Sequence, residues 1–284
     1  MNVNTLNTNN NVYDSVVTPP RMADLAMWLT ADHTTTTAVG ASDHRIDTAH
    51  DRSGKGNDLT QATADNKPQL RNADGQFGGK RVMKFEHATS KPWRVESLQG
   101  TVNVQSIFGT DATPTTDPEF TVAMVLNETA NSASTEVYFS LNEATTSDPD
   151  KVLLLRHAQG AGFRVNGADA QFDTSQIDFT QGTAVTAISV LSDIGTSMSF
   201  FQWIGGTSCD WDDAGIGVDY PCDPDTMFPA LTPTYGTIGA HMTHNGVVSE
   251  WFGEIAECLV WKGAHSGAEI TETLNYLRDK WDCS

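Results

Sequence analysis

One stretch decides how this chain folds: Asp51-Arg52-Ser53-Gly54-Lys55-Gly56-Asn57-Asp58-Leu59-Thr60-Gln61. Its two glycines stand beside small polar or charged residues, which is typical of a backbone that turns sharply and visits positive φ. The side chains of Asp51, Ser53, Asn57 and Asp58 are able to bond nearby backbone amides and so hold such a turn without a hydrophobic anchor. We therefore predict a structured turn here rather than an open loop.

The segments on either side of this turn have the character of β-strands. Residues 24–32 contain the apolar run Leu-Ala-Met-Trp-Leu, and residues 79–86 alternate apolar and polar side chains around Val82 and Phe85. A threonine-rich loop is expected over Thr34 to Thr37. The turn is thus predicted to be a corner between strands of a β domain.

Four ordered motifs resemble those of concanavalin A-like (laminin-G-like) jelly-roll domains. The turn matches the pattern D-x-S-G-x-G-N-x-x-x-Q, and segments 27–32, 66–70 and 253–261 match the patterns L-W-L-x-A-D, N-x-x-P-x-L and G-x-I-A-E-x-x-V-[YW]. The resemblance spans Leu25 to Trp281 and implies an all-β, two-sheet antiparallel jelly-roll sandwich over residues 23–284. Because such domains include lectins, adhesion modules, virion proteins and glycan-cleaving enzymes, the resemblance implies the fold more than the function.

The rest of the chain adds further strands and one helix. Phe120 to Leu126 is predicted to be a central strand, residues 184–191 and 198–204 a hairpin, and residues 205–233 a loop insertion. A capping box is expected where Ser266 is followed by Glu269. It begins a C-terminal helix that we expect at the edge of the sandwich, with one apolar face made by four residues: Ile270, Leu274, Leu277 and Trp281.

Composition narrows the possible partners. The net charge of −19 and the pI near 4.5 argue against a nucleic-acid partner, and no apolar run is long enough to span a bilayer. Residues 1–22 are rich in Asn and Thr, and they lack the basic-then-apolar layout of a secretory signal. We interpret them as an extended arm, either a frayed tail or a segment that orders on a neighbouring subunit.

The four cysteines leave the redox state open. They lie at Cys209, Cys222, Cys258 and Cys283. A bond between Cys209 and Cys222 in an oxidising medium and four free thiols are both compatible with this spacing.

No constellation predicts catalysis. A glycosidase needs two carboxylates at a suitable separation, and the nearest match is the strand from Glu250 to Glu257. Strand alternation is expected to place Glu254 and Glu257 on opposite faces, and the resemblance implies that Glu257 is structural. We therefore predict that the chain is not an enzyme.

Two binding sites are predicted in loops. Closely spaced oxygen ligands suggest Ca²⁺ as a cofactor at Asp210, Asp212, Asp213 and Asp219, although a solvated acidic loop is the alternative. Flat aromatic side chains in loops are suited to stacking on sugars. The candidates for glycan binding are Trp93, Trp211 and Tyr220.

The leading functional interpretation is a non-enzymatic surface protein of a bacteriophage virion. It would be a multi-copy or homo-oligomeric capsid decoration or fibre-like component, with the arm contacting other virion proteins and a lectin-like domain presented to glycans. The retained Met1 without a leader, the polar arm and the resemblance motivate it. An exported bacterial carbohydrate-binding or adhesion module is the alternative, and a glycan-cleaving enzyme is a third hypothesis.

Overall fold

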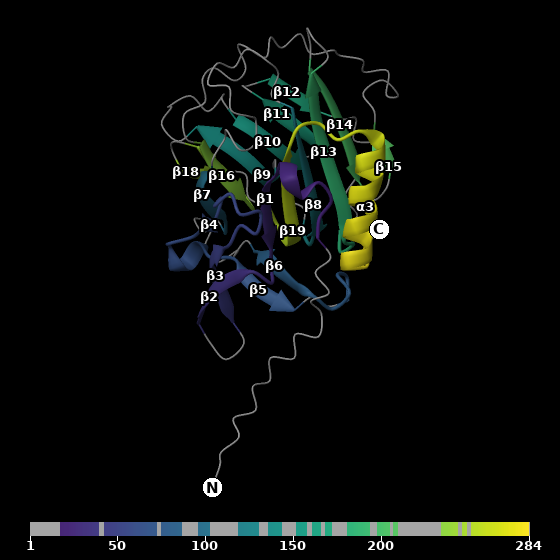
Figure 1. Ribbon diagram of the computed structural model, residues 1–284. Coiled ribbons are helices and arrows are strands. Elements are labelled where there is room, and N and C mark those ends of the chain that lie inside the picture. The colour runs from purple at the N-terminus through teal and green to yellow at the C-terminus, as the bar shows by residue number, and fades with distance from the viewer. Residues whose placement is uncertain are drawn as a thin grey trace.

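The structure is a computed structural model of the whole chain. It describes fifteen segments: residues 18–39, 43–72, 75–86, 96–102, 119–130, 136–143, 152–157, 161–165, 168–171, 181–193, 198–204, 207–209, 234–243, 246–248 and 251–283. Within these segments the chain is almost entirely β-strand, with one α-helix near the C-terminus (Figure 1).

Seventeen strands form one continuous curled sheet in which every pairing is antiparallel, and β17 and β18 form a separate pair. One part, here called sheet I, has the order β15-β14-β13-β8-β19, with β1 and β6 on the other side of β19 and β5 beside β6. Its strands are β1 (Leu25–Thr30), β5 (Gln69–Asn72), β6 (Arg81–Phe85), β8 (Phe120–Glu128), β13 (Val185–Asp193), β14 (Met198–Ile204), β15 (Thr207–Cys209) and β19 (Gly253–Lys262).

The other part, sheet II, has the order β12-β11-β10-β9-β16-β7-β4-β3-β2. Its strands are β2 (Thr34–Ala38), β3 (His44–Ala49), β4 (Leu59–Thr60), β7 (Leu98–Val102), β9 (Glu136–Glu143), β10 (Val152–His157), β11 (Ala161–Val165), β12 (Ala168–Gln171) and β16 (Thr234–Ile238). The short hairpin of β17 (His241–Thr243) and β18 (Gly246–Val248) follows β16.

Strand β3 connects the two sheets. Its first residues pair with β5 and its last residues with β4, and the register with β2 slips so that Asp47 has no residue opposite it. An extra residue of this kind bends a strand and changes which face its side chains reach. Asp47 separates Arg45, which pairs with β5, from Thr48, which pairs with β4.

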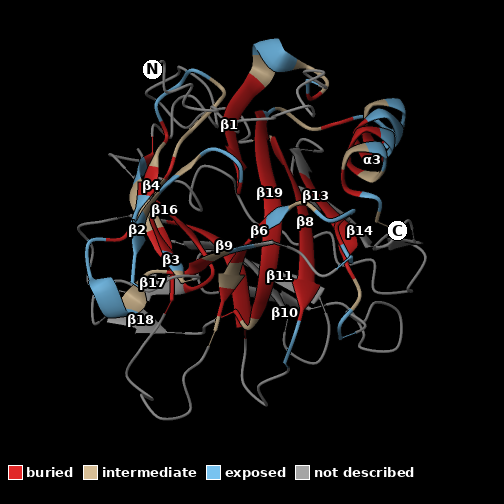
Figure 2. Cartoon of the chain, turned by 90° about the horizontal axis from the view of Figure 1, so that it is seen from below, coloured by how far each residue is buried: buried red, intermediate tan, exposed pale blue. Residues whose placement is uncertain are grey.

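The main core lies between the sheets. Buried side chains of β1, β8 and β19 from sheet I pack with those of β7, β9 and β16 from sheet II. Figure 2 shows β8 and β19 as buried along most of their length. Each Å² of apolar area buried in this way stabilises the fold by about 25 cal/mol, and this burial is what chiefly holds a sandwich together. The prediction of an all-β, two-sheet antiparallel sandwich is confirmed.

A second apolar cluster lies on the outer face of sheet I and is covered by α3 (Gly267–Trp281). The helix packs against β8 and β13, which are inner strands of sheet I, so the expectation of an edge position was wrong (Figure 1). The capping box and the buried face predicted for this helix are both confirmed. None of the described helices is long and apolar enough to cross a membrane.

The organising turn forms as predicted. Gly54 and Gly56 have φ values of 81° and 78°. The carboxylate of Asp51 accepts hydrogen bonds from three backbone amides, those of Trp28, Ser53 and Asn57, each at 2.9 Å. The turn is therefore fastened to β1 through Asp51.

Other strand predictions had mixed outcomes. Strand β8 is central, and β13 and β14 form the predicted hairpin. Thr34 to Thr37 is not a loop, because these residues form most of β2 and pair with β3. Threonine is a strong strand former, and a partner strand nearby decides between the two states. Strand β15 lies at the start of the predicted insertion.

Candidate functional site

The first polar site is a carboxylate enclosed between β19 and α3. Glu257 is completely buried. Its Oε1 accepts hydrogen bonds from the Trp28 indole at 2.6 Å, the Tyr276 hydroxyl at 2.8 Å and the Lys280 ammonium at 2.7 Å. Its Oε2 accepts a bond of 2.5 Å from the Trp281 indole. Both oxygens of the carboxylate are thus occupied by the protein itself.

The low-dielectric setting of this site changes the acid–base behaviour of its donors. Burial raises the pKa of Tyr276, and the negative charge of Glu257 raises it further, so the phenol remains a donor. Burial lowers the pKa of Lys280, and the attraction of Glu257 opposes that effect without cancelling it. The site has the properties of a structural ion pair that joins β1, β19 and α3.

The structure corrects the prediction that the two carboxylates of this strand, Glu254 and Glu257, lie on opposite faces. The register between β19 and β8 slips between Ile255 and Glu257, which leaves Ala256 as a bulge. Glu254 and Glu257 therefore lie on the same outer face, contrary to the expected alternation, because a bulge reverses the phase of a strand. Glu254 is buried and accepts a 3.0 Å hydrogen bond from Asn127, and Glu257 is closed under α3.

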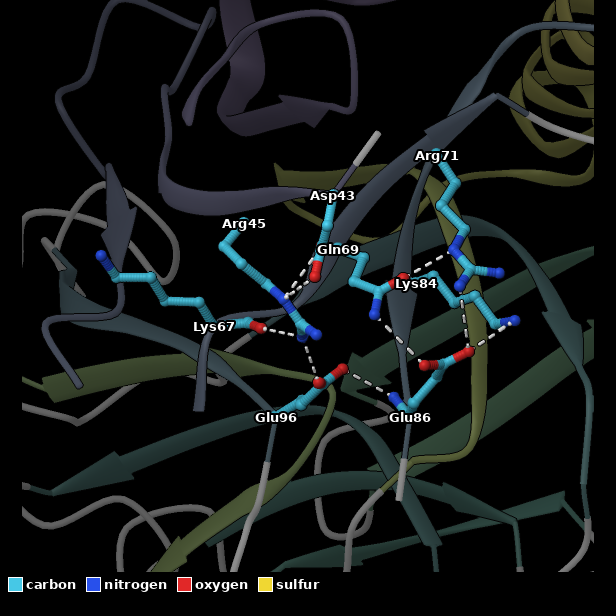
Figure 3. A network of polar contacts seen from close by, with 8 residues as sticks. All are labelled: Asp43, Arg45, Lys67, Gln69, Arg71, Lys84, Glu86 and Glu96. Carbon is cyan, nitrogen blue, oxygen red and sulfur yellow. Dashed lines mark hydrogen bonds and ion pairs between the residues drawn. The ribbon is translucent and has the colours of Figure 1, made fainter. Parts of the chain in front are cut away.

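The second polar site continues the outer face of sheet I beyond α3, over β3, β5 and β6 (Figure 3). Arg45, Gln69 and Lys84 occupy one cross-strand row. Arg45 donates to the buried Glu96 at 2.7 Å, and Gln69 donates to Glu86 at 3.3 Å. The network contains eight residues: Asp43, Arg45, Lys67, Gln69, Arg71, Lys84, Glu86 and Glu96.

The charges of this network are matched by ion pairs, and the ammonium of Lys67 pairs with Asp47 beside the network. Burial raises the pKa of Glu86, but the hydrogen bond and charge of Lys84, at 2.7 Å, and the charge of Arg71 lower it overall. Glu96 also accepts a bond of 2.7 Å from the backbone amide of Glu86. Each cation of the network is matched with an anion or a carbonyl, so this surface is held together from within.

The third polar site crosses the outer face of sheet II. Six residues of neighbouring strands lie directly opposite one another, and we call them the threonine row: Thr35, Thr48, Thr60, Gln99, Thr237 and Ser140. Neighbouring strands are roughly 4.8 Å apart, so the row extends for about 24 Å. It places one hydroxyl or amide group on each of six strands.

Part of the threonine row has no hydrogen-bond partner among the described residues. Thr35 and Thr60 are exposed, Gln99 is half-buried and Thr237 is fully buried. The Gln99 Oε1 and the Thr237 Oγ1, on residues that face each other across β7 and β16, have no hydrogen-bond partner in the described part of the chain. Buried polar atoms are normally paired, so these two neighbouring acceptors are an exception within the row.

The loop sites predicted from the sequence cannot be compared with this geometry. Trp93, Trp211 and Tyr220 lie outside the described residues, and so do four aspartates: Asp210, Asp212, Asp213 and Asp219. In the segments that the structure describes, no group of three or more His, Cys, Asp or Glu side chains is placed to hold a metal ion. Cys258 and Cys283 are free thiols, and burial raises the pKa of Cys283 to about 11.

No protein-family model matches the chain, and no curated protein is significantly similar to it. Several solved structures are similar to parts of the chain. The CBM40 of the Ruminococcus gnavus IT-sialidase, bound to alpha2,3 sialyllactose, has 14% identity over 55% of this chain and 82% of its own, with a TM-score of 0.41. The NanB sialidase from Streptococcus pneumoniae has 15% identity over 61% of this chain and 27% of its own, with a TM-score of 0.41.

A third similar structure is the Trypanosoma rangeli sialidase, with 10% identity over 90% of this chain and 33% of its own and a TM-score of 0.47. The identities and TM-scores are too low for these structures to carry an argument about function. Fold and sites together define the chain as an antiparallel β-sandwich. In its described part, the outer face of sheet I is closed and the polar row on sheet II is partly unpaired.

Proposed function

We propose that this chain is a non-enzymatic carbohydrate-binding protein of the concanavalin A-like type, displayed on the surface of a bacteriophage virion. The observation that carries the binding part is the threonine row, in which the exposed Thr35 and Thr60 lie in line with two buried acceptors that have no described partner, Gln99 Oε1 and Thr237 Oγ1. Sugars present many hydroxyl donors, and a row of hydroxyl and amide groups across a sheet offers complementary partners at regular spacing. Orientation by a few polar groups is how such sites obtain specificity.

The absence of catalysis is part of the same proposal. Its support is that Glu257 is sealed by four donors and that Glu254 is buried against Asn127. Neither carboxylate is placed to flank a sugar on an accessible surface, which hydrolysis requires. Release of reducing ends from a bound polysaccharide, abolished by Glu254→Gln, would contradict this part.

The binding part is tested on a glycan microarray with Gln99→Ala and Thr237→Val. We expect each variant to lose on the order of tenfold in affinity for any glycan that the wild type binds, since a good hydrogen bond is worth about 1–1.5 kcal/mol. Thr30→Val is the matched control, because Thr30 is a buried threonine of sheet I whose hydroxyl also has no described partner. Equal binding by all three variants would place the glycan elsewhere.

The virion part rests on the polar arm of residues 1–22 and on the display role that the resemblance implies. The test is sedimentation of native material on a density gradient. Co-migration with large particles after a high-salt wash supports a structural component. A slow, free peak would favour the exported adhesion module and leave the glycan-binding proposal standing.

A further inference from the structure

Arg52 lies at the junction of the organising turn and sheet I, and its side chain is held in a fixed orientation. Its backbone amide donates to the Trp28 carbonyl at 2.9 Å, and its guanidinium carbon lies 4.2 Å from the centre of the Trp28 ring. The ring cannot rotate freely, because its indole nitrogen is bonded to the buried Glu257. The guanidinium plane is therefore ordered before any ligand arrives.

The hydrogen-bond donors of Arg52 are nevertheless unused by the described residues. Three other arginines lie against carboxylates: Arg21 on Asp24 and Glu269, Arg45 on Asp43 and Glu96, and Arg71 on Glu86. In the described part of the chain, no carboxylate or carbonyl accepts from the side chain of Arg52. Arg52 thus differs from these three arginines, in a protein with 36 acidic and 17 basic residues where a guanidinium has many possible partners.

A second cation lies beside the same ring. The ammonium of Lys280 is 5.3 Å from the centre of the Trp28 ring and is bonded to Glu257. Burial lowers the pKa of Lys280, and the positive charge of Arg52 lowers it further, while Glu257 and Asp32 act in the opposite direction. The neighbouring Asp51 carboxylate is occupied by the amides of the turn. An anion placed at Arg52 would therefore also reduce the repulsion between the two cations.

We propose that Arg52, stacked on Trp28 beside Lys280, binds the carboxylate of an acidic sugar, so that the glycans recognised by this protein include uronic acids. The planar guanidinium with parallel N–H donors matches a carboxylate in a two-bond arrangement, and the indole supplies a flat apolar wall next to it. The choice of a sugar as the source of the carboxylate rests on the proposed function. The carboxylate site itself does not depend on it.

The site is tested by following the Arg52 Nε–H and Trp28 Nε1–H signals by NMR during four titrations: sodium glucuronate, glucose, sodium acetate and N-acetyl-aspartate amide. We expect glucuronate to produce saturable shifts of both signals, acetate to produce the same shifts at higher concentration, and glucose to produce none. Arg52→Lys should weaken glucuronate binding on the order of tenfold, and Arg52→Gln should abolish it.

Arg81→Gln is the matched control, because Arg81 is exposed on β6 and has no described ion pair either; it should bind as the wild type does. Equal loss in the Arg81 and Arg52 variants, or shifts that never saturate, would overturn the site. Tighter binding of the aspartate derivative than of glucuronate would overturn the acidic sugar and leave the carboxylate site intact. Loss of glucuronate binding in Gln99→Ala would instead assign the sugar to the threonine row.

Discussion

The buried carboxylate of Glu257 and the acceptors of the threonine row are polar groups in similar surroundings with opposite states of pairing. Four donors from β1 and α3 surround Glu257. Gln99 and Thr237 lie among strands of equal regularity and have an oxygen without a described partner. The protein therefore uses the polar side chains around Glu257 for stability, whereas in the threonine row it holds two buried acceptors without a described partner.

At Glu257 the covering element is the C-terminal helix. The outer face of sheet I carries α3, whose last turns deliver Tyr276, Lys280 and Trp281 to the sheet. Along the threonine row, Thr35 and Thr60 are exposed, Thr48 and Gln99 are half-buried, and Thr237 and Ser140 are fully buried. A buried group without a partner costs free energy, and such a cost is common where a protein binds a ligand.

The largest effect on stability is expected for Glu257→Gln. The substitution keeps the shape of the side chain but leaves the buried Lys280 without its counter-ion, and we expect a loss of about 3–5 kcal/mol in the free energy of unfolding. Urea denaturation measures it. Glu272→Gln, at an exposed position of α3, should change stability by less than about 0.5 kcal/mol. A small effect at Glu257 would mean that the closed face is not held by this ion pair.

The second prediction concerns how stability depends on pH through a buried histidine under α3. His265 lies below α3, and burial, with the charge of Arg21, lowers its pKa to about 4. The unfolded chain therefore takes up a proton near pH 6.5, before the folded chain does, so stability is full above pH 6.5 and falls as the pH drops toward 4. We expect a loss of up to about 3 kcal/mol from this group. Thermal unfolding of the wild type and His265→Gln at pH 7 and pH 4.5 gives the difference, and identical pH profiles would contradict the assignment.

A smaller effect is expected at the start of α3. In the capping box the Ser266 amide donates to Glu269 at 2.7 Å, and the Ser266 side chain accepts from the backbone of Glu269. Ser266→Ala removes the second bond and should lower the free energy of unfolding by about 1 kcal/mol. Ser266→Gly should cost less, because glycine is tolerated at this position. Equal losses of stability in the two variants would show that the side-chain hydrogen bond of Ser266 is not what stabilises the start of the helix.

The smallest effect, and one of opposite sign, is predicted for Thr237→Val. Removing a buried hydroxyl without a described partner should leave stability unchanged or raise it by up to about 1 kcal/mol. Thr121→Val is the matched comparison, because the Thr121 hydroxyl donates to Gly263 and accepts from His265, and its loss should cost about 1–3 kcal/mol. If both variants lose the same amount, the Thr237 hydroxyl is paired and the two faces do not differ.

Short sequence patterns correctly predicted the two structures that are held by local hydrogen bonds, the organising turn and the helix cap. The turn at Asp51 and the cap at Ser266 depend on side chains and amides a few residues apart, so their patterns were sufficient. The β strand at Thr34 was not predicted, because its state depends on pairing with β3. The prediction that Glu254 and Glu257 lie on opposite faces was wrong, because nothing in the sequence marks the bulge at Ala256.

The threonine row and the Arg52 site could not be predicted from local sequence patterns either, because both depend on contacts between distant parts of the chain. The threonine row joins residues from Thr35 to Thr237 through five separate registers, and Arg52 is significant only because Trp28 and Lys280 meet it. Single threonines and a single arginine carry no signal of this kind in a sequence. The aromatic and acidic loop residues attracted attention because their clustering is visible along the chain.

The pairing of β1 with β19 also bears on how the protein is made. Leu25 lies opposite Trp261, and the Trp28 indole is bonded to Glu257, so the strand β1 acquires its neighbour only after residue 261 has left the ribosome. Contacts of such long sequence separation form slowly, and until they form the apolar strand β1 is open to other chains. Truncation within α3, even by its last turn, would remove Trp281 and Lys280 and leave the nascent sandwich without its closing contacts.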